Sequence, residues 1–278
     1  MNYIQINLKI SPQYPWKEVI TQELATIGFE SFVDEEKELQ AFVNEENFDN
    51  NNFISLIERY KKQEVNIDFE QLLIPSQNWN ATWEESYPSV KIDKDLLIRA
   101  PFHEKDDSYA LSLEIQPQMS FGTGHHQTTY LLCKKLLTLD FKNKTVLDVG
   151  TGTGVLGILA SLLGAASVFG TDIEAGAVEN AKENCKRNAI ENFTIVEGDI
   201  EVVPKKTFDV ILANINKNVL MRHIKSYSQL IADGGTLLLS GFFENDTPSL
   251  LEVAEKNDFK FDEVITLENW AILKLNKK

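Results

Sequence analysis

A glycine loop between a buried strand and a helix constrains this chain of 278 residues more than any other feature. Residues Thr145–Val149 form a short apolar run, which is typical of a strand buried on both faces. Gly150, Gly152 and Gly154 follow at alternate positions, and a helix is predicted from Val155. Glycine is required where a strand turns sharply while its backbone passes close to a ligand. The free N–H groups of the helix then face that ligand, so the loop predicts a binding site.

The same loop fits two adenosine cofactors. Residues 152–157 match the dinucleotide pattern G-x-G-x-x-G. In that pattern the first glycine closes the strand, whereas here Gly150 holds this place two residues earlier. Asp148 precedes the turn, where its carboxylate would attract the ammonium of S-adenosylmethionine and repel a pyrophosphate. These two features favour S-adenosylmethionine over NAD.

Acidic residues follow the next two predicted strands. The strand over 166–171 ends at Asp172, whose carboxylate can accept hydrogen bonds from both ribose hydroxyls of either cofactor. The strand over 193–197 leads to Asp199, which is placed to meet an adenine edge while Ile200 covers the ring. Both positions predict an adenosine ligand without choosing between the two cofactors.

An asparagine follows the fourth strand of this series. Residues 208–213 form that strand, and Asn214 stands at its carboxyl end. The carboxyl ends of strands face the crevice in open α/β sheets. An amide is neutral, and its acceptor oxygen can hold an amine N–H in line with a methyl donor. From Lys144 to the end, strands and helices are predicted to alternate, as in a doubly wound Rossmann-like α/β sheet. Within it, Val155–Gly170 is interpreted as a helix buried against the sheet.

The first 74 residues predict a different architecture, a ferredoxin-like α+β domain. Strand and helix patterns follow one another in the order βαββαβ, over Tyr3–Ile10, Pro15–Ile27, Phe29–Val33, Leu39–Val43, Asn50–Lys62 and Val65–Leu73. This part contains no histidine, no cysteine and no glycine-rich loop. A binding or docking module is therefore favoured, and a purely structural cap is the alternative.

A linker separates the two predicted domains. Over residues 75–90 the aromatic side chains Trp79, Trp83 and Tyr87 recur every four residues, which indicates a short amphipathic helix. The second domain, residues 91–278, is expected to begin with strands over Val90–Ala100 and Ala110–Ile115.

Composition excludes several classes of protein. The 27 basic and 42 acidic residues give a formal charge of −15, which disfavours direct nucleic-acid binding and favours a basic partner. The two cysteines, Cys133 and Cys185, lie in helical patterns and provide no disulfide framework, so a cytoplasmic protein is expected. The first residues lack the pattern of a signal peptide, and the most apolar stretch is short for a membrane span. Four scattered histidines give no metal-ligand spacing.

Taken together, the glycine loop and the strand-end residues resemble the class I S-adenosylmethionine-dependent methyltransferases. The preceding loop, residues 121–129 (FGTGHHQTT), is similar to the FGTG-x-H-x-TT stretch of the family that methylates protein eleven of the large ribosomal subunit. Residues 78–83 (NWNATW) also resemble the linker of that family. The likeness covers essentially the whole chain, and the N-terminal domain matches the family's substrate-recognition domain.

The resemblance implies trimethylation of lysine ε-amino groups and of the N-terminal α-amino group of that ribosomal protein, a basic substrate, by a monomeric enzyme. It places the cofactor contacts on Thr129, Gly150, Asp172 and Asn214. Gly152 and Asp199 join them from the loop and strand-end patterns, and Phe121 with its loop is expected to close over the methionine end. Asn214 and Phe121 would position the reactants. No general base is assigned, because no histidine or glutamate at the strand ends is an evident candidate for that role.

Two positions depart from the family pattern. Gln127 replaces a proline that is common after the loop histidine. The residues after Asn214 are Ile215, Asn216 and Lys217, where many relatives have Ile-Leu-Ala, so a positive charge is expected near the crevice.

Three other functions remain open. A methyltransferase for nucleic acid or a small molecule is one, although residues 214–217 lack the Asn-Pro-Pro-aromatic sequence of many amine-methylating enzymes. An NAD-dependent oxidoreductase would use the shifted glycine pattern. A non-catalytic ribosome-binding module on a former methyltransferase scaffold is the third, and the intact glycine loop argues against it.

Overall fold

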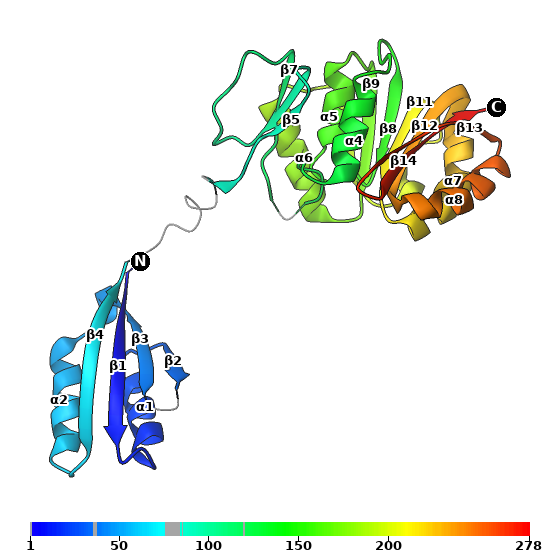
Figure 1. Cartoon of the computed structure of the whole chain (residues 1–278). Coiled ribbons are helices and arrows are strands. Elements are labelled where there is room, and N and C mark those ends of the chain that lie inside the picture. Colours follow the sequence, from blue (N-terminus) through cyan, green and yellow to red (C-terminus); the bar gives the residue numbers. More distant parts are fainter. Residues whose placement is uncertain (1, 36–37, 76–83, 85, 119) are drawn as a thin grey trace. The chain divides into compact units, whose positions relative to one another are not determined.

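The computed structural model describes residues 2–35, 38–75, 84, 86–118 and 120–278. Contacts divide it into two compact units, Met1–Ser86 and Tyr87–Lys278. The expected linker helix, with Trp79 and Trp83, lies largely outside the described residues. Each unit is described by itself (Figure 1).

The first unit has a four-stranded antiparallel sheet covered by two helices. Its elements follow the order β1 (Tyr3–Ser11), α1 (Trp16–Thr26), β2 (Ser31–Asp34), β3 (Leu39–Asn44), α2 (Asn50–Lys61) and β4 (Asn66–Ile74), with a 3-10 turn at Glu45–Asn47. The sheet order is β2-β3-β1-β4, so the two central strands are connected through α1 and β2. This is the βαββαβ order that the sequence predicts.

Alternation along the strands builds the core of this unit. On β1, residues 4, 6, 8 and 10 are buried while their neighbours are more exposed, because successive side chains point to opposite faces of a sheet. The apolar sides of α1 and α2 supply Ile20, Leu24, Phe53 and Ile57 to the same cluster. The core therefore lies between one face of the sheet and its two helices.

The second unit begins with a small sheet of three strands. These are β5 (Val90–Ile92), β6 (Leu96–Arg99) and β7 (Leu111–Glu114). The single strand expected over Val90–Ala100 is wrong, because Asp93 adopts a positive φ of 49° and the chain reverses into an antiparallel β5–β6 hairpin. β6 then pairs in parallel with β7.

The main sheet has seven strands in the order β10-β9-β8-β11-β12-β14-β13. Its elements are α4 (Gln127–Leu136), β8 (Thr145–Val149), α5 (Val155–Leu162), β9 (Ser167–Asp172), α6 (Ala175–Arg187), β10 (Phe193–Glu197), β11 (Phe208–Asn214), α7 (Lys217–Leu230), β12 (Ile231–Phe243), α8 (Thr247–Glu255), β13 (Phe259–Leu267) and β14 (Trp270–Lys277), with 3-10 turns at Ile200–Val202 and Glu244–Asp246. The five strands from β10 to β12 in this order are parallel. β14 is antiparallel to both of its neighbours.

This order departs from the expected alternation at one place. β13 and β14 form a hairpin with no helix between them, so β14 inserts between β12 and the edge strand β13. The dinucleotide-binding fold has instead the order 3-2-1-4-5-6. The order seen here therefore argues against the NAD alternative.

Apolar residues on both faces of this sheet form two separate clusters. Along β8, Val146 belongs to the cluster under α4, α5 and α6, whereas Leu147 and Val149 belong to the cluster under α7 and α8. The apolar stretch Val155–Gly170 is divided between helix α5 and the start of β9, so the interpretation of it as one helix is wrong beyond Leu162. The sheet thus carries helices on both faces, as a doubly wound fold requires (Figure 1).

The prediction that both cysteines lie in helices is confirmed. Cys133 and Cys185 are buried within α4 and α6 and are not joined by a disulfide. On α6, the small residues Ala177 and Ala181 are buried on the same side as Cys185. Among the described residues, no helix is both long and apolar enough to cross a bilayer.

Candidate functional site

A cavity of about 370 Å³ lies at the carboxyl ends of the parallel strands. It is bordered by the loop after β8, the ends of β9, β10 and β11, and the first turns of α6 and α7. Of the residues predicted from the sequence, six line it, namely Phe121, Gly150, Gly152, Asp172, Asp199 and Asn214. The structure therefore gathers residues that are separated by up to 93 positions in the chain (214 − 121).

The glycine loop has the conformation for which glycine is required. Gly150 and Gly152 have φ angles of 71° and 55°, in the region that L side chains rarely adopt. A Cβ on Gly150 would lie 2.2 Å from Cγ2 of Ile215, and one on Gly152 would lie 2.2 Å from the carbonyl oxygen of Phe121. Any larger residue would therefore distort the floor of the cavity.

The FGTG loop is attached directly to the glycine loop. The backbone N–H of Thr153 donates to the carbonyl of Phe121 at 2.9 Å. The hydroxyl of Thr153 donates to the carbonyl of Gly122 at 2.6 Å. Thr153 is fully buried, whereas the Phe121 side chain is 52% exposed and forms part of the cavity wall.

Asp172 closes the loop from the neighbouring strand. Its Oδ2 accepts from the N–H of Gly152 at 2.8 Å, and its Oδ1 accepts from the N–H of Glu174 at 3.1 Å. These bonds hold the carboxylate at the edge of the cavity and leave further lone pairs on both oxygens. Ile173 beside it is 71% exposed and lines the same wall, a contact that the sequence analysis missed.

Asp199 lies at the end of β10 and caps the following turn. Its Oδ1 accepts from the N–H of Ile200 at 2.8 Å, and its Oδ2 lies 3.4 Å from Nε2 of His223 on α7. The expected contact of Ile200 with the cavity is wrong. The turn directs Ile200 into the core under α7 and α8, where it is 8% exposed.

Asn214 is hydrogen-bonded to a neighbour on α4. Its Nδ2 donates to the hydroxyl of Thr129 at 3.3 Å, and its buried Oδ1 has no hydrogen-bond partner. A buried acceptor without a partner costs free energy, and such groups are common where a ligand completes the bond. Thr129 is itself fully buried behind Asn214 and does not line the cavity. A direct contact of Thr129 with a cofactor thus stays a prediction.

Asp148 is not on the cavity wall, contrary to expectation. As alternate residues of β8 face opposite sides, Asp148 points, like Val146, toward the helices α5 and α6. It is fully buried, and one oxygen accepts from the hydroxyl of Thr151 at 2.7 Å. Burial raises the pKa of its carboxyl to about 6. The direct attraction of a ligand ammonium, one of the two reasons for preferring S-adenosylmethionine, is therefore not available in this geometry.

Lys217 brings no free charge to the crevice. Its ammonium group lies 2.6 Å from Oδ1 of Asp246, and this hydrogen bond lowers the pKa of the Asp246 carboxyl. Lys217 does not line the cavity. The positive side chain there is Arg222 on α7, which the sequence analysis did not select.

An aromatic cluster adjoins Phe121, and we call it the aromatic wall. The ring of Phe121 contacts that of His126 at 5.1 Å between centroids, His126 contacts Trp270 at 4.7 Å, and Trp270 contacts Phe243 at 4.2 Å. Burial lowers the pKa of His126, whose Nδ1 accepts from the N–H of Thr128 and caps α4. Phe243 and Trp270 come from β12 and β14, so only the sheet topology brings them to this loop.

A larger cavity, about 500 Å³, lies in the first unit. It is lined by the segment from Gln13 to Ala25 and by Phe32, Asp34 and Leu39 of the sheet. None of the predicted site residues belongs to it. Of these two cavities, we assign the chemistry to the smaller one, because it combines strand ends, a helix N-terminus and a buried acceptor without a partner.

Comparisons with known proteins agree with this assignment. The family model of ribosomal protein L11 methyltransferases matches residues 13–278. The ribosomal protein L11 methyltransferase of Porphyromonas gingivalis is 39% identical over 92% of this chain and 89% of its own length. That of Phocaeicola vulgatus is 34% identical over the full length of both chains. The crystal structure of ribosomal protein L11 methylase from Lactobacillus delbrueckii subsp. bulgaricus superposes with a TM-score of 0.64 at 28% identity, covering 69% of this chain and all of that one.

Proposed function

Since the chain belongs to the ribosomal protein L11 methyltransferase family and is an S-adenosylmethionine-dependent methyltransferase, we propose that it methylates amino groups of ribosomal protein L11. The acceptors we propose are lysine ε-amino groups and the N-terminal α-amino group, each carried to the trimethyl state. The formal charge of −15 supports a basic protein as substrate and disfavours the nucleic-acid alternative. We further propose that the enzyme acts as a cytoplasmic monomer.

The cavity at the strand ends fits S-adenosylmethionine. Gly150 and Gly152 let the backbone approach the ligand, and the carboxylates of Asp172 and Asp199 face the same space as acceptors for hydroxyl and amino groups. The cofactor supplies a methyl group activated by its positively charged sulfur. The observation that carries the proposal is the buried Oδ1 of Asn214, because it is an acceptor without a partner at the end of the central strand β11.

Asn214 would act by holding the acceptor amine in place. Its Nδ2 donates to Thr129, which leaves the lone pairs of its Oδ1 to accept from an amine N–H. A lysine amino group has a pKa near 10.4 in water and must lose a proton before it attacks, and an apolar pocket lowers that pKa. Holding the neutral amine in line with the methyl carbon can remove up to about 10 kcal/mol of the barrier.

The loop histidines have structural hydrogen bonds, which supports a reaction without a histidine base. His125 interacts with the hydroxyls of Tyr87 and Thr123 and with the carbonyl of Pro88, and His126 caps α4. The aromatic wall offers apolar surface beside Phe121 for the methylene chain of a lysine. Its ring faces also attract cations, which suits an acceptor that becomes a trimethylammonium group.

We assign substrate recognition to the first unit, with the boundaries predicted from the sequence: residues 1–74 for recognition, 75–90 for the linker and 91–278 for catalysis. The cavity of about 500 Å³ in this unit is lined by apolar side chains such as Phe32 and Leu39 and by Glu18, while Asp34 in the same lining is ion-paired with Lys17. An apolar hollow of this kind suits a protein partner.

Mass spectrometry of L11 after incubation with the full chain and S-adenosylmethionine tests the proposal. We expect a series of added methyl groups on specific lysines and on the α-amino group, and no product with NAD in place of the methyl donor. Asn214→Ala should lower kcat by about 100-fold, on the scale of removing one hydrogen bond that orients a reacting group. The control is Asn257→Ala, whose Nδ2 donates to Val253 on α8 away from the cavity. Methylation of RNA or a small amine with L11 unchanged would contradict the proposed substrate.

A further inference from the structure

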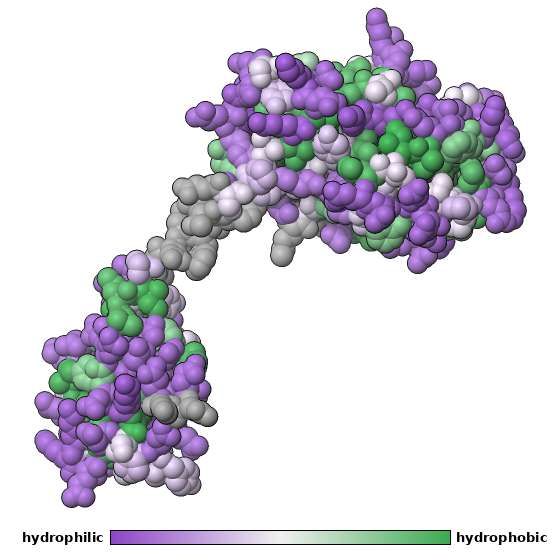
Figure 2. All heavy atoms as spheres, viewed as in Figure 1, coloured by the Kyte–Doolittle hydropathy of each residue, from purple (hydrophilic) through white to green (hydrophobic). Residues whose placement is uncertain are grey.

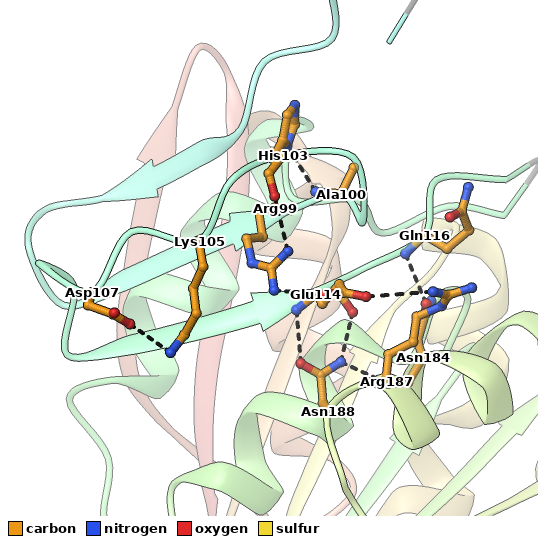
Figure 3. Close-up of polar contacts among 10 residues, drawn as sticks. All are labelled: Arg99, Ala100, His103, Lys105, Asp107, Glu114, Gln116, Asn184, Arg187 and Asn188. Atoms are coloured by element: carbon orange, nitrogen blue, oxygen red, sulfur yellow. Dashed lines mark hydrogen bonds and ion pairs between the residues drawn. The ribbon is translucent and has the colours of Figure 1, made fainter. Parts of the chain in front are cut away.

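Three asparagines recur every four residues along the inner side of α6 and at its C-terminal cap. They are Asn180, Asn184 and Asn188, of which the first two are at most 1% exposed. Asparagine is a poor helix former, so its burial in a helix requires hydrogen bonds that repay desolvation. Figure 3 shows Asn184 and Asn188 side by side beneath the segment that runs from Glu114 to Gln116.

Asn188 fastens β7 to the helix. Its Oδ1 accepts from the N–H of Glu114 at 2.9 Å, and its Nδ2 donates to the carbonyl of the same residue at 2.7 Å. The side-chain amide thereby pairs with one backbone position as a neighbouring strand would. The Glu114 carboxylate also forms ion pairs with Arg99 at 2.7 Å and with Arg187 at 3.6 Å (Figure 3).

Asn184 connects two segments that meet at the cavity. Its Oδ1 accepts from the N–H of Gln116 at 2.9 Å, where the chain leaves β7 toward the FGTG loop. Its Nδ2 donates to the carbonyl of Thr153 in the glycine loop at 3.0 Å and to Oδ1 of Asn180 at 3.2 Å. All of these bonds are made by one side chain that is completely buried.

Thr153 links Asn184 to the wall of the cavity through hydrogen bonds. The N–H and the hydroxyl of Thr153 donate to the carbonyls of Phe121 and Gly122, while Asn184 binds both the N–H of Gln116 and the carbonyl of Thr153. Asn184 does not line the cavity. It therefore affects the site only through the spacing of the two loops.

We propose that Asn184 is a positioning residue for S-adenosylmethionine, which sets the distance between the glycine loop and the FGTG loop through Thr153 and Gln116. The proposal deepens the cofactor site of the proposed function and does not depend on which protein amines are methylated. Removing the amide leaves the Gln116 N–H and the Thr153 carbonyl without partners, so both loops would shift from the arrangement that closes on the cofactor.

Two substitutions and one control test this. Asn184→Ala removes the whole amide, whereas Asn184→Asp keeps the shape and the acceptor for Gln116 but loses the donor to Thr153. Asn188→Ala is the control, because Asn188 at the C-terminal cap of α6 fastens β7 and donates to the backbone carbonyl of Asn184, but it touches neither loop and leaves the Asn184 side chain in place. The measurements are the dissociation constant of S-adenosylhomocysteine, the amide exchange rate of Thr153 without ligand, and KM for S-adenosylmethionine against kcat.

We expect both Asn184 variants to bind S-adenosylhomocysteine about tenfold more weakly, the scale of one lost buried hydrogen bond. Thr153 should exchange its amide proton faster in the same two variants, and KM for the cofactor should rise more than kcat falls. Asn188→Ala should lower the melting temperature while leaving all three quantities within about twofold, since its bonds lie outside both loops.

The proposal is overturned if the Asn184 variants keep their affinity and Thr153 exchange, or if Asn188→Ala weakens binding as much as they do. Should Asn184→Ala fail to fold, the isosteric Asn184→Asp decides between these outcomes. Normal binding of S-adenosylhomocysteine by the wild type without methylation of L11 would count against the proposed substrate and leave this inference intact.

Discussion

The two units of this protein differ in what they bury. Among the described residues, the first unit buries a single polar side chain, Asn44, at 8% exposure. The second buries ten, namely Thr128, Thr129, Asp148, Thr151, Thr153, Thr171, Asn180, Asn184, His223 and Ser240. Most of these lie in or next to the glycine loop, the strand ends and the helices that support them. Figure 2 shows that both units are nevertheless largely hydrophilic on the outside in that view.

The first unit is thus packed almost entirely with apolar side chains, whereas the second also buries polar side chains around its cavity. The first unit is held by an apolar core. The second also buries polar groups whose hydrogen bonds connect the glycine loop to neighbouring segments, as those of Thr153 and Asn184 do. Of the ten, Asp148, Thr171 and Asn180 each keep one polar atom without a hydrogen-bond partner, as does Asn214, which is less buried. Substitutions in the two units should therefore have different consequences.

The largest effect is expected in the apolar core of the first unit. Phe53 is fully buried and contacts the rings of Phe29, Phe48 and Phe69. Phe53→Ala should cost about 3–5 kcal/mol of unfolding free energy, the usual range for a buried phenylalanine. Calorimetry should show the loss or shift of one transition, with binding of S-adenosylhomocysteine unchanged and methylation of L11 strongly reduced.

The matched control is Phe261→Ala, because Phe261 is 41% exposed on β13 and should cost less than about 1 kcal/mol. Loss of cofactor binding in Phe53→Ala would show that the two units do not fold separately.

A buried carboxyl in the second unit should make its stability depend on pH. The folded pKa of Asp148, about 6, is above the unfolded value near 3.9. The proton is therefore bound more tightly in the folded state. Its contribution to stability is complete below the unfolded pKa and is lost as the pH rises through about 6, which amounts to about 3 kcal/mol. Asp148→Asn should thus stabilise the unit at pH 8 but not at pH 4, as measured by denaturant unfolding.

Asp106→Asn is the control for an exposed loop carboxylate, and it should show no such gain at pH 8. An equal effect of Asp148→Asn at both pH values would contradict the raised pKa.

Two glycines of the second unit show how much a single added methyl group should matter at the cavity and away from it. Gly152→Ala places a Cβ 2.2 Å from the Phe121 carbonyl at a φ of 55°, so S-adenosylhomocysteine should bind at least tenfold more weakly, or about 1.4 kcal/mol. Gly176→Ala on α6 has nothing within 4 Å of the added Cβ and should leave affinity unchanged while stabilising the helix slightly. Calorimetric titration of both variants measures this, and equal affinities would refute the role of the close contact.

The smallest effect is expected at Lys217. Its ion pair with Asp246 is partly exposed, with side chains 34% and 25% accessible, and such pairs contribute less than about 1 kcal/mol. Lys217→Met should change kcat by less than about threefold, because the charge is already neutralised outside the cavity. Steady-state kinetics and thermal unfolding check both statements. A large loss of activity would mean that Lys217 reaches the substrate.

The sequence predicted the regular parts of both units well. Period-two alternation located β1, and the short buried run located β8 at its observed bounds, because these patterns depend on local geometry. It also gave the residues that end β9, β10 and β11. The errors fall where a side chain turns inward or a strand reverses. One residue at positive φ, Asp93, broke an apparently continuous strand, and nothing in its neighbours' hydropathy indicates that conformation.

The side of the sheet toward which a side chain points was harder to predict from the sequence. Asp148 stands next to the glycine loop in sequence, but the pleat directs it to the opposite side from the cavity. Ile200 was misplaced for a related reason, because the turn capped by Asp199 points it into the core. In both cases the sequence predicted a segment that does border the cavity, but the side chain chosen within that segment points away from it.

The sequence by itself determined the two architectures, the glycine loop and the strand-end residues Asp172, Asp199 and Asn214, because strand periodicity and the need for glycine at positive φ are local properties. Only the tertiary structure decided which of these side chains meet, that Trp270 and Phe243 join Phe121 in the aromatic wall, and that Asn184 holds two loops at once. Those contacts join residues from different strands and helices. Their geometry is set by sheet order and pleat, which no short stretch of sequence contains.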